Sequence, residues 1–455
     1  MRQSEMTKLG DFIFSKLIET KLPGLTVSIV EEGKVIYARG FGFKNVERAA
    51  PTTIQTNYGI GSVSKSFTAL AISKLVEDGK LDFHDRVTDL IPSLRGRGLE
   101  QVEIHHLLTH TSGIPGLGWA EALIFNATKQ SRSWLPVASS DDMASFFDGV
   151  SAWREAPPGT KYFYLNEGYF LLGEVISKVS GKSYAQYVRD NILVPLKMNR
   201  TFFSREEVEA DGNFAVPYLI KDGIARSSSV PWQSQPSAGG IMSNVSDFSN
   251  YIMMYLGRGE FAGIRIADER TIEGMWTPYS HPPKRIFPDL SYGYGFFVTR
   301  QFFGERLVYH GGSVSVYTSG MALLPDRGIG FSVLANGEGY DPVLLCLYGL
   351  SLMLGKDPEL DLPPIRRENL LRRLEGTYRT YKGLLSARVT RSGDFLILSG
   401  EDVGSYILVP EEGSELQEDV ATFFTLSETA RMVVQFRFSA NGTEMIFERY
   451  RYRKE

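Results

Sequence analysis

The stretch Tyr58-Gly-Ile-Gly-Ser-Val-Ser-Lys-Ser-Phe-Thr-Ala-Leu70 constrains the fold of this chain more than any other part of it. Its two glycines end an extended segment, and apolar residues then recur at helical spacing up to Asp78 and Gly79. The sequence therefore predicts a strand that turns sharply into a helix, and this helix begins almost at Ser62.

Ser62 and Lys65 lie three positions apart at the start of this helix. Residues at that spacing share a helix face, so the lysine amine can reach the serine hydroxyl. The positive end of the helix dipole disfavours an ammonium ion, so we expect Lys65 to lose its proton more easily than a free lysine. A serine becomes an effective nucleophile when such a base stands beside it. The competing interpretation is a capped surface helix with a solvated lysine.

Composition excludes several classes of function. The chain has 455 residues, enough for two or three domains, and its net charge is −4 from 49 basic and 53 acidic residues. That balance gives no electrostatic reason to expect nucleic acid or an anionic membrane as a partner. The single cysteine, Cys346, excludes an intrachain disulfide framework and a cysteine-rich zinc site.

Two features of the sequence indicate where in the cell the protein is located. Residues 1–8 carry charge and lead into an amphipathic stretch instead of an apolar signal core. No apolar run approaches the length that spans a bilayer. We therefore expect a soluble, cytoplasmic protein with no membrane partner.

Alternation and helical spacing predict a mixed set of elements in the first 355 residues. Strands are expected at 25–30, 34–38, 306–309, 320–324 and 331–335, and helices at 11–20, 169–179 and 343–354. Residues 115–155 are rich in loops and aromatic residues, as expected of an insertion that lines or covers a pocket.

Three histidines, His105, His106 and His110, lie close together and raise the possibility of a metal site. His106 and His110 have the helical spacing of a zincin pair, but no glutamate lies between them to serve as a base. We therefore favour a helix end whose histidines bond to backbone groups. The sequence predicts neither a metal nor a cofactor.

Two further segments carry side chains suited to chemistry. Tyr164 and Asn166 precede a long apolar helix, and two positions apart in an extended segment they would face one cleft. A tyrosine can relay a proton, and an asparagine can donate to a carbonyl and accept from an ammonium ion. Residues 310–313, His-Gly-Gly-Ser, follow a strand, where glycines allow another backbone to approach closely. On its own, His310 would more often be structural than catalytic.

Lys356–Pro364 is the clearest linker in the chain. The sequence after it consists of seven or eight short alternating segments, which predict a small antiparallel barrel. We therefore expect a first domain over 1–355, a linker over 356–370 and a barrel domain over 371–455. The barrel's aromatic residues are expected in its core, which favours a structural or oligomerisation module over a lipid-binding one: Phe423, Phe424, Phe436 and Phe438.

In chain order, Ser62-x-x-Lys65, Tyr164-x-Asn166 and His310-Gly-Gly resemble the motifs of the serine β-lactamase and penicillin-recognising superfamily. More narrowly, the chain resembles the CubicO-type branch related to class C β-lactamases and esterases. Supporting segments also match that branch: 106–114, Pro158-Gly159, 172–176, 195–198 and 238–241. The resemblance covers roughly residues 8–355. It implies an α/β (α+β) fold, in which helices flank an antiparallel sheet beside an all-helical subdomain.

The added barrel makes the chain similar to the archaeal self-compartmentalising serine peptidases. That similarity implies a lipocalin-like C-terminal domain, a closed homo-oligomer and action on peptides that contain D-residues.

The superfamily resemblance also implies roles for individual residues. Ser62 would be the acylated nucleophile and Lys65 its proton acceptor. Tyr164 would pass the proton to the leaving group and help to activate the deacylating water, and Asn166 would hold Lys65 and the substrate carbonyl. His310 would take the place of the usual strand lysine.

Substrate binding would fall to Gly311, Gly312 and Ser313, with the backbone N–H groups of Ser62 and Ser313 as the oxyanion hole. The strand departs from the family's Lys-Thr-Gly. Strong β-lactamase or carboxypeptidase activity is therefore less expected than esterase or peptidase activity. The leading hypothesis is an acyl-transfer serine hydrolase of small peptides or amides. An esterase or weak β-lactamase is its nearest rival, and a non-catalytic ligand-binding protein is the alternative from another class.

Overall fold

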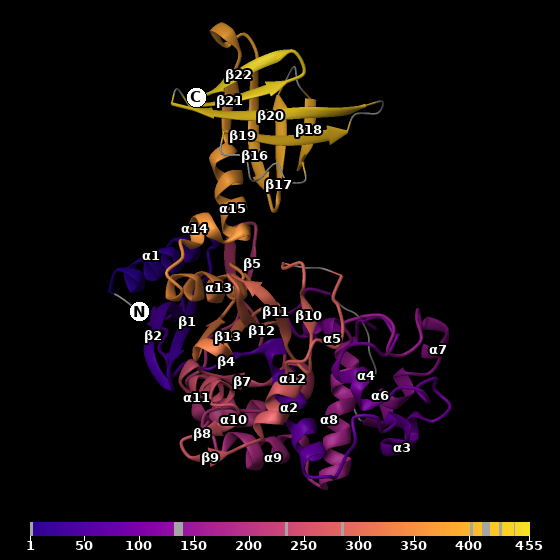
Figure 1. Cartoon of the computed structure of the whole chain (residues 1–455). Coiled ribbons are helices and arrows are strands. Elements are labelled where there is room, and N and C mark those ends of the chain that lie inside the picture. The colour runs from indigo at the N-terminus through magenta and orange to yellow at the C-terminus, as the bar shows by residue number, and fades with distance from the viewer. Residues whose placement is uncertain are drawn as a thin grey trace. The chain divides into compact units, whose positions relative to one another are not determined.

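The computed structural model describes residues 3–131, 140–232, 235–283, 286–400, 404–411, 419–426, 430–440 and 442–455. The chain divides into two units, Met1–Met353 and Leu354–Glu455, which are described separately below (Figure 1). None of the helices in the described ranges is long and apolar enough to cross a membrane.

An antiparallel sheet of eight strands forms the centre of the first unit, as far as the described residues show. In spatial order the strands are β10 (Ser291–Tyr292), β11 (Phe297–Phe302), β12 (Glu305–Ser313), β13 (Thr318–Leu324), β14 (Ile329–Ala335), β1 (Gly24–Glu31), β2 (Lys34–Asn45) and β3 (Ala50–Pro51). The predicted hairpin of β1 and β2 is confirmed, with Glu32 and Gly33 in left-handed conformations at its turn.

Helices cover both faces of this sheet. On β14, a side chain at Gly330 would meet Ile252 of α11 (Val245–Leu256), while the ring of Phe331 lies against Gly349 of α13 (Pro342–Met353). Successive strand residues point to opposite faces, so α11 and α13 lie on opposite sides. Because helices cover both faces, every residue of β13 and β14 is buried.

The first helix closes the same face as α13, although the two lie at opposite ends of the unit's sequence. α1 (Gln3–Thr20) runs beside α13, as Figure 1 shows in indigo and orange. The rings of Phe12 and Tyr348 stack there with centroids 3.7 Å apart. This contact ties the start of the chain to the last helix of the unit.

The remaining helices form a region next to the sheet. They are α2 (Ser64–Glu77), α3 (Val87–Leu90), α4 (Ile104–Leu108), α5 (Trp119–Ala127), α6 (Ser140–Phe146), α7 (Val150–Trp153), α8 (Asn166–Ser180), α9 (Tyr184–Val188), α10 (Arg205–Asp211) and α12 (Glu269–Met275). Three short strand pairs complete the unit: β4 (Tyr58–Gly59) with β7 (Met242–Ser243), β5 (Tyr218–Lys221) with β6 (Ile224–Ser227), and β8 (Glu260–Phe261) with β9 (Ile264–Arg265).

α2 lies in the interior of the unit. Every residue from Ser64 to Ser73 is buried, and the helix packs on α8 and α12. The competing interpretation of the sequence, a surface helix with a solvated lysine, is therefore wrong.

The second unit is a closed antiparallel barrel. Its strands are β15 (Gly376–Arg379), β16 (Ser386–Ser392), β17 (Phe395–Gly400), β18 (Gly404–Pro410), β19 (Val420–Leu426), β20 (Arg431–Ser439), β21 (Gly442–Phe447) and β22 (Tyr450–Lys454). β15 pairs with β22 through Tyr378 and Lys454, which closes the barrel. The expected fold, a β-lactamase-like sheet and helices followed by a small antiparallel barrel, is confirmed.

Two helices occupy the segment expected to be a linker: α14 (Pro358–Asp361) and α15 (Pro363–Leu374). Leu371 and Leu374 of α15 belong to the apolar core of the barrel unit. Phe423 and Phe436 are buried in that core as expected. Phe424 is only partly buried, beneath the guanidinium of Arg431, since it points the opposite way from its neighbour on β19.

Candidate active site

Ser62 lies in a tight turn, η1 (Gly61–Val63), between the short strand β4 and helix α2. Gly61 has φ +51°, and a side chain on it would come within 2.6 Å of the backbone nitrogen of Ser313 on β12. A side chain on Gly312 would in turn lie 3.0 Å from the backbone nitrogen of Ser62. Both glycines are needed because two backbones meet here. The close approach that we predicted at Gly312 occurs, and the partner is the turn that carries Ser62.

Lys65 lies one helical turn after Ser62, and its side chain is fully buried. Its Nζ lies 3.0 Å from Ser62 Oγ, 2.8 Å from Asn166 Oδ1 and 2.7 Å from the backbone oxygen of Ala238. The last two atoms can only accept hydrogen bonds, so they take two N–H groups of the amine. In the neutral amine the lone pair remains for the Ser62 hydroxyl.

Burial lowers the pKa of Lys65 from its usual value to about 7, because an ammonium ion is poorly solvated in the interior. The carboxylates of Glu121 and Glu167 oppose this shift. The pKa is lowered as we expected, and its main cause is desolvation by burial; the contribution of the helix dipole stays a prediction. An appreciable share of Lys65 is therefore an uncharged base at neutral pH.

Asn166 begins α8, and Leu165 is the N-cap residue. Our expectation that Asn166 lies in an extended segment is therefore wrong by one residue, yet both Tyr164 and Asn166 line the same cavity. The Nδ2 of Asn166 donates a 2.9 Å hydrogen bond to Glu121. That bond fixes the orientation of the amide, so that Oδ1 faces Lys65.

Tyr164 lies beside the amine, with Lys65 Nζ 4.9 Å from the centre of its ring. Burial raises the pKa of the Tyr164 phenol above its usual value, and the Ser62 hydroxyl opposes that shift in part. Tyr164 is therefore a protonated phenol at neutral pH. In that form it can donate a proton and accept another in the same step.

His310 lies on β12 with its ring centre 6.5 Å from that of Tyr164. Its Nδ1 lies 2.6 Å from the carbonyl oxygen of Gly311, which can only accept, so Nδ1 carries the ring proton. Its Nε2 then accepts from the Tyr292 hydroxyl at 3.0 Å. Burial and the nearby Lys65 lower the pKa of His310 to about 3. The ring is therefore neutral and supplies no positive charge to the site.

A cavity of about 910 Å³ opens beside Ser62. Tyr164, Asn166 and residues 310–313 form part of its wall, and α5 supplies another part. Other lining side chains are mainly apolar and include Trp119, Leu123, Ile124, Leu290, Phe297 and Tyr309. The prediction that residues 115–155 line a pocket is thus confirmed for α5, while residues 132–139 lie outside the described part of the chain.

Along this cavity, no strand of the described residues pairs with the outer edge of β12. Pairing between β11 and β12 ends at Phe297 and Tyr309, so residues 310–313 extend beyond β11. On their other side they continue to pair with β13. An uncovered strand edge of this kind can bind an extended acyl or peptide segment through main-chain hydrogen bonds.

The three clustered histidines bond to neighbouring groups of the protein. The Nδ1 of His106 accepts from the backbone of Glu103, and the Nδ1 of His110 accepts from the backbone of Leu165. His105 is hydrogen-bonded to the Tyr294 hydroxyl instead. The expectation of backbone bonding is confirmed for His106 and His110. Across the described ranges, no three His, Cys, Asp or Glu side chains are grouped to hold a metal ion.

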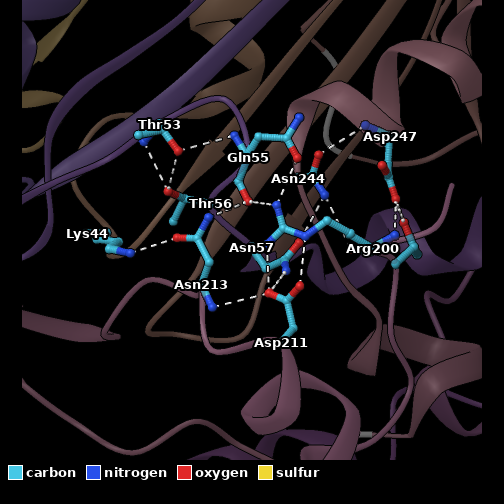
Figure 2. A network of polar contacts seen from close by, with 11 residues as sticks. Lys44, Thr53, Gln55, Thr56, Asn57, Arg200, Asp211, Asn213, Asn244 and Asp247 are labelled. Carbon is cyan, nitrogen blue, oxygen red and sulfur yellow. Dashed lines mark hydrogen bonds and ion pairs between the residues drawn. The ribbon is translucent and has the colours of Figure 1, made fainter.

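A polar network holds the strand that leads to Ser62 (Figure 2). Arg200 makes two hydrogen bonds of 2.7 Å with Asp211, and the same carboxylate accepts from Asn57, the residue before β4. Asn57 also accepts from Asn244, which caps α11. The network thus joins β4, the end of α10 and the start of α11, and it fixes the direction from which the chain enters the Ser62 turn.

The structure brings Ser62, Lys65, Tyr164, Asn166 and residues 310–313 to one cavity. Sequence reasoning gave no role to Glu121, Glu167 or the carbonyl of Ala238, all of which act on Lys65. Glu121 lies within the insertion, where no local pattern distinguishes it. Ala238 contributes a backbone oxygen, and because every residue has one, the residue type does not indicate this contact.

Comparison with known proteins agrees with this geometry. A family model described as beta-lactamase matches residues 9–345, and one described as Pab87 octamerisation domain matches residues 358–453. The structure of an octameric penicillin-binding protein homologue from Pyrococcus abyssi is 42% identical and superposes with a TM-score of 0.92. It covers 99% of this chain and 100% of that one.

Curated relatives match over the first unit. Protein flp from Staphylococcus aureus strain MW2 is 28% identical over 334 residues, which is 71% of this chain and 62% of that protein. Penicillin-binding protein 4* from Bacillus subtilis strain 168 is 34% identical over 204 residues, 44% of this chain and 42% of that protein. The chain thus spans less than two thirds of the length of either relative. Through its first unit, which carries the Ser62–Lys65 site, the chain belongs to the beta-lactamase family.

Proposed function

We propose that this protein is a serine hydrolase that cleaves small peptides or amides through an acyl-enzyme on Ser62. The observation that carries the proposal is the 3.0 Å contact between Ser62 Oγ and a buried lysine amine whose pKa is about 7. A neutral amine in this position takes the hydroxyl proton as Ser62 attacks the substrate carbonyl carbon. The new C–O bond turns the carbonyl oxygen into an oxyanion.

We propose that the backbone N–H groups of Ser62 and Ser313 receive that oxyanion. The distances at Gly61 and Gly312 bring the two amides to adjoining positions at the cavity. Each such donor typically lowers the barrier by about 3 to 4 kcal/mol. Tyr164 then passes a proton from the Lys65 ammonium to the leaving amine, which allows the C–N bond to break. In deacylation the same groups act in reverse on a water molecule.

The charges at the site support one class of substrate over another. The strand position that would otherwise carry a cation is occupied by a neutral histidine, His310. A substrate carboxylate, as in a β-lactam or at a peptide C-terminus, therefore lacks a fixed positive partner there. We propose peptide or amide substrates, including those with D-residues, and regard ester hydrolysis by the same site as the rival activity.

We further propose that the protein is a homo-oligomer assembled through its barrel unit. The match of residues 358–453 to an octamerisation domain and the octameric state named for the Pyrococcus abyssi homologue support this proposal. Ile407 and Leu426 on the barrel strands expose 60% and 70% of their surface, and we propose that another copy of the chain covers them. Light scattering on the wild type and on Ile407→Glu tests the proposed oligomer. A monomeric wild type would contradict the proposal.

Two measurements test the hydrolase proposal. Intact-mass analysis after exposure to a fluorophosphonate should show one adduct on Ser62, and Ser62→Ala should show none. Turnover of D- and L-aminoacyl amides, acyl esters and a chromogenic cephalosporin then ranks the substrates. Turnover of esters with no turnover of amides would favour the esterase. Absence of any adduct would favour a ligand-binding protein.

A further inference from the structure

The mechanism proposed above gives no role to His110, although this residue is fully buried beside the site. Its backbone has φ +58°, in the left-handed region that few residues other than glycine, asparagine, aspartate and histidine adopt. In this conformation both the backbone oxygen and the ring Nδ1 of His110 face the segment 163–165. The backbone oxygen of His110 accepts from the amide of Phe163 at 2.7 Å, and its ring Nδ1 accepts from the amide of Leu165 at 3.0 Å.

Phe163 and Leu165 are the residues on either side of Tyr164, so His110 holds the backbone of Tyr164 from both directions. The His110 ring also lies against the phenol ring itself, with centroids 4.2 Å apart and an angle of 34° between the planes. Tyr169 and Tyr292 pack on the same imidazole, at 5.1 Å and 4.9 Å. His110 therefore contacts both the backbone on either side of Tyr164 and the face of its ring, which fixes the position and tilt of that ring together with Lys65 and His310.

The tautomer of His110 follows from these partners. A backbone N–H can only donate, so Nδ1 carries no proton and the ring proton is on Nε2. Burial, with Lys65 and His310 nearby, holds the pKa of His110 well below its usual range, so the Nδ1 acceptor persists at neutral pH. Nε2 is buried and has no hydrogen-bond partner among the described residues. An unsatisfied donor in the interior destabilises a fold, and an apolar ring here would instead leave the amide of Leu165 without its acceptor.

We propose that His110 is the positioning residue for Tyr164: by binding the amides on both sides of that tyrosine, it holds the phenol where a proton can pass between Lys65 and the leaving group. The role rests on the proposed function, because it assigns His110 to the proton-relay step of that reaction. It requires an acceptor at the place of Nδ1 and a residue that tolerates the left-handed backbone.

Three substitutions separate these requirements. His110→Asn keeps both the left-handed conformation and an acceptor, His110→Gly keeps the conformation alone, and His110→Phe keeps a ring without the acceptor. We expect His110→Asn to retain the wild-type kcat on an aminoacyl amide within about threefold. His110→Phe and His110→Gly should lose tenfold or more in kcat with little change in KM. If His110→Phe does not fold, the glycine variant carries the comparison.

A double-mutant cycle with Tyr164→Phe separates positioning from a general loss of structure. If His110 acts through Tyr164, His110→Gly should cost tenfold or more in the wild-type background and less than threefold in the Tyr164→Phe background. Equal losses in both backgrounds, or a glycine variant as active as the wild type, would overturn the role of His110 while leaving the proposed function intact. A wild-type protein in which Ser62 takes no fluorophosphonate would overturn the proposed function, and the role with it.

Discussion

Asn166 joins two titratable side chains: its amide oxygen accepts from Lys65 Nζ at 2.8 Å, and its amide nitrogen donates to Glu121 at 2.9 Å. The amide thus contacts both an amine and a carboxylate and carries no charge. An uncharged partner satisfies the Lys65 amine and leaves its pKa low enough for a base.

Replacing Asn166 with aspartate tests that relationship. A carboxylate of the same size would stabilise the Lys65 ammonium ion, and an opposite charge at this distance typically raises a lysine pKa by about 1 to 3 units. We expect Asn166→Asp to move the pH dependence of kcat/KM upward by at least one unit and to lower activity at pH 7. Asn166→Gln, which keeps the amide, is the matched control. An unchanged pH profile in the aspartate variant would contradict the assignment.

The stability of the protein should depend on pH through Lys65. Its pKa is about 7 in the folded chain and about 10.4 when unfolded, so the unfolded state binds more protons between these values. The free energy of unfolding should therefore rise with pH across this window, by at most about 1.4 kcal/mol per unit. Lys65→Met removes this contribution, so the wild type should gain stability relative to the variant between pH 7 and 10. A constant difference between the two would show that the amine is not buried.

Gly61→Ala should disrupt the contact between the Ser62 turn and β12. A Cβ there lies 2.6 Å from the Ser313 nitrogen, and the backbone has φ +51°, so the turn and β12 must move apart. Loss of an oxyanion donor lowers kcat by about a hundredfold to a thousandfold. Gly33→Ala is the control, because Gly33 also has a positive φ of 72° but no atom within 4 Å of the added Cβ. Similar kcat values for both variants would argue against this geometry.

The Arg200 network should stabilise the first unit. Arg200→Lys keeps the charge but loses the two-pronged contact with Asp211, and we expect it to lower the free energy of unfolding by roughly 1 to 3 kcal/mol. The exposed pair of Arg205 and Glu209 provides the control, since both side chains are about half exposed. Arg205→Lys should change stability by less than about 0.5 kcal/mol. Urea denaturation gives the free energy of unfolding of both variants. Equal losses of stability in the two would contradict a structural role for the network.

Much of this site could be predicted because its parts are local in sequence. Ser62 and Lys65 are one helical turn apart, and the glycines at 311 and 312 directly precede Ser313, so spacing alone predicted their proximity. The partners of Lys65 could not be predicted in the same way. Glu121 and the Ala238 carbonyl reach the amine from 56 and 173 residues away, through tertiary packing.

His110 shows a different limit. The sequence pointed to the residue, and backbone bonding was the favoured interpretation, but its partners lie 55 residues further along, at Leu165. Its left-handed backbone comes after α4 in a segment with no turn signal at that position. The helices α14 and α15 also differ from the linker that prolines at 358, 363 and 364 indicated. Proline at the first positions of a helix is compatible with it, and here each helix begins at a proline.

The most direct test of the account is the pH dependence of Ser62 acylation by a fluorophosphonate, followed by intact mass in the wild type and in Lys65→Arg. If a neutral Lys65 is the base, as proposed, the labelling rate of the wild type should rise through a single titration near pH 7. It should then level off, while the arginine variant, which stays charged, should label at least a hundredfold more slowly. A wild-type labelling rate that does not change between pH 5 and 9, or equal labelling of the two proteins, would contradict the claim that Lys65 activates Ser62.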